Sequence, residues 1–137
     1  MEFTEHFDSY ACIGDTIRLR VTPDVDVVAR IQFDRDTRPE NFDCYEAKHI
    51  AQWRRDEWFF CGVVLAIEVN GRTVKDYVGS LWGIECNFGS NNKYLTEVAN
   101  DLLTEHLDDV EDILEAFSKA ASAGLESIKS QRKGVAQ

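Results

Sequence analysis

Apolar and polar residues alternate along the first part of the chain. Between residues 15 and 21 every second position is apolar, and the same two-residue period continues from Val25 to Phe33. The segment Thr22-Pro23-Asp24 separates the two runs and has the composition of a turn. This pattern predicts two half-buried strands, joined as a hairpin.

A second hairpin is predicted from the long apolar run between Trp58 and Val69, which has the composition of a central strand covered on both faces. Asn70-Gly71 follows, and both central positions of a type I′ turn require positive φ. Gly79 and Gly83 are expected to mark bulges in the returning strand. A two-residue turn there would pair Ile67 with Val74, Val63 with Val78, and Phe59 with Trp82.

The polar segment 34–43 predicts a loop between the hairpins, and a short helix is expected to follow it. Asp43 and Glu46 have the spacing of a capping box, with Asp43 in the capping position. The predicted helix carries His49 and Trp53 toward Arg55.

Helical periodicity returns between residues 94 and 118, where eight carboxylates occur without a Lys or Arg. Six of them fall within a sector of roughly 80° and form what we call the acidic ridge, opposite an apolar face that extends from Leu95 to Phe117. The ridge consists of Glu97, Asp101, Glu105, Asp108, Asp112 and Glu115. Asp108-Asp109 could divide this helix into two, because Asp favours helix starts over helix interiors. The later carboxylates need not then align with the earlier ones.

Together these elements predict an α+β fold. We expect a mainly antiparallel sheet of about four strands in two hairpins, a short helix, and one or two C-terminal amphipathic helices packed on one face. The 137 residues fit a single domain, with 1–12 and 131–137 expected to be loose.

Charge narrows the range of partners. The net charge is −10 and the pI about 4.7, so the chain should repel nucleic acid and anionic membranes. No apolar run has the length of a membrane-spanning helix, and the N-terminus lacks the pattern of a secretory signal. We therefore expect a cytoplasmic protein.

Candidate catalytic residues are few. His6, His49 and His106 are widely separated, and Cys44 lies five positions before His49, which would point the two side chains about 140° apart on a helix. The four cysteines form no CxxC motif and are expected to be buried, reduced thiols. The sequence predicts no enzymatic activity, no cofactor and no metal site.

Four segments resemble a family of small, uncharacterised acidic proteins that bacterial plasmids, integrative elements and phages carry. The most specific is Leu-Trp-Gly-Ile-Glu at 81–85, and the others lie at 41–45, 56–64 and 94–100. The resemblance implies no activity and no catalytic residue. It does imply a mobile-element context, in which accessory proteins often inhibit host restriction or CRISPR systems.

Two groups of residues are candidates for binding a partner. The acidic ridge could enter a basic nucleic-acid groove as a DNA mimic, because carboxylates at i and i+4 lie about 6 Å apart, comparable with phosphates along a strand. Alternatively, it is the solvated face of an ordinary amphipathic helix. Trp53, Trp82 and Phe88 are candidate hydrophobic anchors if exposed, or core residues if buried.

The sequence thus predicts a non-enzymatic, acidic protein-binding module that binds a basic surface on a host protein through the acidic ridge. The resemblance to mobile-element proteins implies that this host protein is a nucleic-acid-binding defence protein and that the module is an inhibitor of the anti-CRISPR or anti-restriction type. The alternative is a small structural or homodimeric accessory protein without nucleic-acid mimicry. The apolar side of the C-terminal helix would then form the dimer interface.

Overall fold

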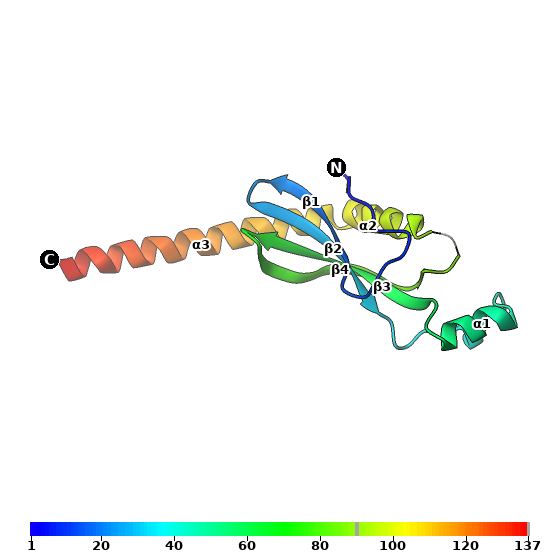
Figure 1. Ribbon diagram of the computed structural model, residues 1–137. Coiled ribbons are helices and arrows are strands. Elements are labelled where there is room, and N and C mark those ends of the chain that lie inside the picture. Colours follow the sequence, from blue (N-terminus) through cyan, green and yellow to red (C-terminus); the bar gives the residue numbers. More distant parts are fainter. Residues whose placement is uncertain (90, 137) are drawn as a thin grey trace. The chain divides into compact units, whose positions relative to one another are not determined.

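The protein is an α+β fold, as the sequence predicts. The computed structural model describes residues 1–89 and 91–136, which divide into two compact units, 1–106 and 107–137. The first contains a four-stranded antiparallel sheet with strand order β1-β2-β3-β4 (Figure 1). Its elements are β1 (Thr16–Thr22), β2 (Val25–Phe33), a 3₁₀ turn η1 (Pro39–Asn41), α1 (Ala47–Arg54), β3 (Phe59–Val69), β4 (Arg72–Cys86) and α2 (Lys93–Glu105).

The second unit is a single helix, α3 (Leu107–Ala136). It has 30 residues, and every residue from 115 to 134 is exposed. Residues 131–136, which the sequence suggested would be loose, belong to this helix.

β3 forms the centre of the sheet. It pairs with β2 on one side and β4 on the other, and eight consecutive residues from Phe60 to Ile67 are buried. Burial on both faces explains why this strand has a continuous apolar sequence rather than an alternating one. The prediction of a central, doubly covered strand is confirmed.

Both predicted turns are present, but the predicted register of the second hairpin is wrong. Asn70 and Gly71 have φ values of 52° and 76°, as a type I′ turn requires, and Val69 pairs with Arg72. Beyond this point bulges move the pairing. The observed partners are Ile67 with Lys75, Val63 with Leu81, and Phe59 with Cys86.

The bulges explain how 15 residues of β4 pair with 11 of β3. One includes Gly83, whose φ of 73° strongly favours glycine. Trp82, expected opposite Phe59, instead lies against Gly62.

The start of α1 also differs from the prediction. Glu46, not Asp43, occupies the capping position, because the helix begins at Ala47. His49 Nδ1 accepts the Glu46 backbone N–H at 3.2 Å. His49 therefore contributes to the helix start.

α2 packs against β3 and β4 through five buried residues. The N-terminal segment is anchored on the same helix. Phe3 and Phe7 are buried, and their backbone N–H groups donate to Asn100 Oδ1 at 2.7 Å and Thr96 Oγ1 at 3.0 Å. The sequence offered no periodic signal for this packing.

Asp34 connects the end of β2 to the Gly83 bulge. Its buried carboxylate accepts hydrogen bonds from the Asp36 and Thr37 backbone N–H groups, the Thr37 hydroxyl at 2.7 Å, and the Gly83 N–H at 2.9 Å. Burial alone would raise the pKa of Asp34, but these hydrogen bonds outweigh it and lower the pKa below the ordinary value of 3.8.

Replacing Asp34 by Ala should lower the free energy of unfolding by about 2–3 kcal/mol, because the donors around the carboxylate lose their acceptor. Because the folded-state pKa is lowered, the carboxylate's pH-dependent contribution is present above the unfolded-state pKa and is lost as the pH falls through the folded-state value. Urea unfolding at neutral pH and below pH 4 measures both effects. Asp36→Ala is the control, since the Asp36 side chain is exposed; equal losses for the two variants would contradict this role.

Candidate functional site

Three carboxylates form an exposed row on α2. Glu97, Asp101 and Glu105 follow each other at intervals of four residues, and all are exposed. Within the described part of the chain, no ion pair or hydrogen bond involves their side chains. We call these residues the α2 carboxylate row.

Acidic residues in the sheet are arranged differently. Arg18 lies 2.6 Å from Glu68 and 3.6 Å from Asp26, and Arg20 lies 3.2 Å from Asp26. These strand arginines thus neutralise acidic side chains of the sheet. The α2 carboxylate row has no such partners.

The acidic ridge does not continue along one helix. The helix breaks at His106, which has φ −105° and ψ 14° and whose N–H bonds to the Leu102 carbonyl. The His106 ring packs directly on Gly79, where a Cβ would lie 2.3 Å from Nε2. The C-terminal helix is therefore divided before Asp108-Asp109, not at these residues. Asp108 and Asp109 instead lie in the first turn of α3, where the helix dipole favours negative charge.

The other three ridge residues belong to α3. Asp108, Asp112 and Glu115 are exposed, and Glu115 lies 3.3 Å from Lys119 on the same helix. The structure therefore assigns half of the predicted ridge to each compact unit.

A groove lies along the edge of β4. Its volume is about 350 Å³, and its apolar lining includes Leu81, Trp82 and Tyr94, which are 49%, 43% and 36% exposed. Large side chains with this exposure on one surface are typical of protein-binding sites. The groove is lined by Tyr45, Leu81, Trp82, Gly83, Ile84, Glu85, Tyr94 and Val98.

Hydrogen bonds fix the two tyrosines of the groove. Tyr45 donates its hydroxyl to Glu85 Oε2 at 2.7 Å, and Tyr94 donates to the Glu85 backbone carbonyl at 2.5 Å. Burial raises the pKa of both tyrosines, and the Glu85 carboxylate raises each further. Both phenols therefore keep their protons, and the hydrogen bonds that they donate to Glu85, to a higher pH than an unperturbed tyrosine.

Trp82 is also held in place. Its indole N–H donates to Ser80 Oγ at 2.9 Å, and Ser80 Oγ lies 2.6 Å from the Tyr77 hydroxyl. The indole ring occupies the space over Gly62, where a Cβ would lie 2.3 Å from the ring. Trp82 is thus a surface residue whose orientation is set before any partner binds.

The α2 carboxylate row adjoins this groove. Tyr94 and Val98 line the groove from α2, and Asp101 and Glu105 follow them by seven residues each, which is about two helical turns. Tyr94, Val98, Asp101 and Glu105 therefore share one side of the helix. Asp101 and Glu105 thus extend the groove side of α2 by about two turns beyond Tyr94 and Val98, while none of the three row carboxylates lines the groove itself.

Trp53 and Phe88 lie elsewhere, around α1. The Arg38 guanidinium carbon lies 5.0 Å from the centre of the half-buried Trp53 ring. Phe88 is also half-buried, and its ring centre lies 4.9 Å from that of Trp58 and 5.0 Å from that of His49. Both side chains are therefore packed against neighbouring residues and are not freely exposed.

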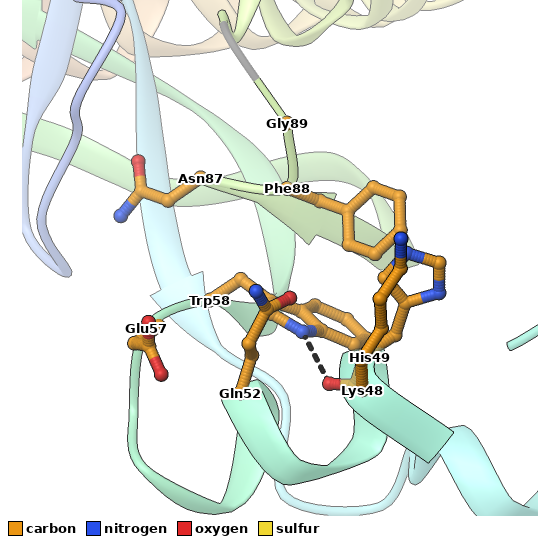
Figure 2. A pocket seen from close by; sticks show the side chains of 8 residues that line it. All are labelled: Lys48, His49, Gln52, Glu57, Trp58, Asn87, Phe88 and Gly89. Carbon is orange, nitrogen blue, oxygen red and sulfur yellow. Dashed lines mark hydrogen bonds between the residues drawn. The ribbon is translucent and has the colours of Figure 1, made fainter. Parts of the chain in front are cut away.

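Figure 2 shows a second pocket, between α1 and the segment 87–89, with a volume of about 370 Å³. The rings of Phe88 and His49 lie close together on one side, and Trp58 donates its indole N–H to the His49 carbonyl at 2.9 Å. The residues that line the pocket are Lys48, His49, Gln52, Glu57, Trp58, Asn87, Phe88 and Gly89. They include no nucleophile paired with a base.

Sequence reasoning missed Tyr94 and Leu81 as parts of the site. Tyr94 precedes Asp101 by seven residues, and this spacing would have placed it on the carboxylate side of the helix. No comparable signal identifies Leu81, because its exposure depends on the bulges that change the register of β4.

Other kinds of site find little support in the described residues. All four cysteines are free thiols, but the prediction that they are buried holds only for the strand residues Cys61 and Cys86, because Cys12 and Cys44 lie in exposed loop segments. Residues 1–89 and 91–136 contain no group of three or more His, Cys, Asp or Glu that could hold a metal ion. None of the described helices has the length and apolarity needed to cross a membrane.

Comparisons of the chain with protein-family models, with curated proteins and with solved structures find no match. The resemblance to proteins of mobile elements therefore stays a prediction.

Replacing Tyr45 by Phe should lower the free energy of unfolding by about 1 kcal/mol at neutral pH, because Glu85 loses its hydroxyl donor. The raised pKa of Tyr45 implies a contribution that is full below the unfolded-state value, near pH 10, and declines as the pH rises toward the folded-state value. The stability difference between the wild type and the variant should thus shrink above pH 10.

Denaturant unfolding of the wild type and of Tyr45→Phe at neutral pH and above pH 10 measures this difference. Tyr10→Phe is the control, because Tyr10 is exposed. A constant difference across the alkaline range would show that Glu85 does not hold the Tyr45 proton.

Proposed function

We propose that this protein is a non-enzymatic protein-binding module, which binds a basic partner at the edge of β4 and α2. The observation that carries the proposal is the groove of Leu81, Trp82 and Tyr94 beside the unpaired α2 carboxylate row. An apolar centre with a charged rim is the usual composition of a specific protein interface. The groove would supply most of the affinity and the carboxylates the selectivity for a basic partner.

The aromatic side chains of the groove are preorganised for binding. Trp82, Tyr45 and Tyr94 each have a hydrogen bond that sets the ring position in the unbound protein. Ordering a mobile side chain at an interface costs roughly 0.5–1.5 kcal/mol, and these rings avoid most of that cost. Rigid aromatic side chains are also the residues that most often dominate binding energy.

The chemistry of the row favours a surface that otherwise binds nucleic acid. Carboxylates at four-residue intervals lie about 6 Å apart along a helix, close to the phosphate spacing of a strand. Three charges imitate only a short length of backbone. We therefore propose that α2 occupies part of the nucleic-acid-binding groove of the partner protein, while Trp82 contacts an apolar residue at the margin of that groove.

Genomic context would define this partner further. If the resemblance to plasmid, integrative-element and phage proteins holds, the partner is a host defence protein that binds DNA or RNA, and the module is its inhibitor. The competing function is that of an accessory protein whose acidic helix face is only solvated. The two differ in whether reversing the charge of the row changes any binding.

Reversing the row with Glu97→Lys, Asp101→Lys and Glu105→Lys should abolish capture of the partner from a bacterial lysate. The matched control reverses Asp24, Asp43 and Asp76, which are exposed, lie outside the groove and change the net charge equally. Capture is measured by quantitative mass spectrometry at low and high salt, since electrostatic association weakens as ionic strength rises. Short duplex DNA added as a competitor should release the same protein.

Two outcomes would contradict the proposal. Equal capture by the row variant and by the control variant would show that the carboxylates are only a solvated helix face. Capture that DNA does not compete would exclude a nucleic-acid-binding surface as the target.

Replacing Trp82 by Ala should weaken binding to the captured protein by more than tenfold, because a central aromatic anchor often contributes 2 kcal/mol or more. Trp53→Ala is the matched control, since Trp53 lies outside the groove. Calorimetry measures both affinities, and circular dichroism checks that both variants fold. Equal losses of affinity would place the interface elsewhere.

A further inference from the structure

α3 carries an apolar stripe with nothing packed over most of its length. Leu114, Phe117, Ala121, Gly124 and Ile128 follow at intervals of three and four residues, which is the heptad spacing of a helix that pairs with another. Phe117 is 42% exposed, Ile128 is 58% exposed, and the neighbouring Leu125 is 53% exposed. Helices in water owe most of their stability to packing of such a face, so this one requires a partner.

Charge along α3 identifies the partner. Residues 107–118 contain five carboxylates and no Lys or Arg, whereas residues 119–134 contain four basic residues and one carboxylate. The helix therefore has an acidic first half and a basic second half. A second copy of α3 in antiparallel orientation would place each acidic half beside the basic half of its partner.

We infer that α3 forms an antiparallel helix pair with α3 of a second copy of this chain. The inference is independent of the proposed function, since it uses none of the groove residues and none of the α2 carboxylate row.

The positions of the side chains set the register. Ala121 is near the middle of α3, and a twofold axis beside it places Phe117 opposite Leu125 of the second copy and Leu114 opposite Ile128 of the second copy. The small side chains of Ala121 and Gly124 let the two helices approach closely at the centre. The large exposed residues Phe117, Leu125 and Ile128 then each meet an apolar residue of the other helix.

One charged pair distinguishes antiparallel from parallel pairing. Glu111 and Arg132 are 21 residues apart, or three heptads, so both flank the stripe on the same side. Around an axis at Ala121, Glu111 lies opposite Gln131 of the second copy, which places it next to Arg132 of the second copy. A parallel pair would instead place Glu111 against Glu111 and Arg132 against Arg132.

This arrangement leaves the other carboxylates of α3 accessible. Asp108, Asp112 and Glu115 lie on the side of the helix away from the stripe, so pairing does not cover them. The dimer is therefore compatible with acidic surfaces on both copies.

Light scattering coupled to size-exclusion chromatography on the full chain tests the pairing. The unchanged protein should have twice the mass of the 15.6 kDa chain at micromolar concentration, and Phe117→Glu should reduce it to one chain. Glu126→Lys is the control, because Glu126 is exposed on the side of α3 away from the stripe. A single-chain mass for the unchanged protein, or a dimer that survives Phe117→Glu, would overturn the inference.

Charge exchange tests the orientation. Glu111→Arg and Arg132→Glu should each weaken the dimer about tenfold, and the two together should restore it, because each helix again presents opposite charges to the other. Failure of the double variant to recover would overturn antiparallel pairing. The variant reversed at Glu97, Asp101 and Glu105 should remain dimeric, so a failed dimer and a failed binding function give different results.

Discussion

Continuous burial of β3 is the constraint on which the rest of the first unit depends. A strand with eight consecutive buried residues needs cover on both faces and a partner on both edges. β2 and β4 supply the edges, and α2 contributes cover through its apolar side. Packing of that side in turn directs the carboxylates of α2 away from the sheet, so the core determines the exposed row.

The edge of the sheet is where this architecture offers a surface to other molecules. β4 has a strand on one side only, and its bulges turn Leu81 and Trp82 outward instead of continuing a regular ladder. Tyr94 and Val98 of α2 complete the groove from the other side. The groove thus combines residues from two elements that are each required for the core, which gives a rigid support to the side chains it exposes.

Sequence patterns predicted what depends on local chemistry and failed where distant contacts decide. Alternation identified β1 and β2, and Asn70-Gly71 identified its turn, because each rests on conformations of a few residues. The predicted pairing was wrong from Ile67 onward, since bulges respond to packing across the sheet. The helix break was expected near Asp108 but occurs at His106, whose ring packs on Gly79, 27 positions earlier in the chain. Trp82 and the first half of the ridge were identified as candidate partner-binding residues, whereas the groove that relates them requires the folded chain.

The contact between Trp82 and Gly62 also couples two positions in evolution. A side chain at residue 62 would occupy the space of the indole, so residue 62 cannot become larger unless residue 82 becomes smaller or moves. A descendant of this sequence that acquires a larger residue at 62 must carry a smaller or displaced residue at 82, and the floor of the groove then changes with it. Selection on the interior of the sheet is therefore also selection on which molecules its edge can recognise.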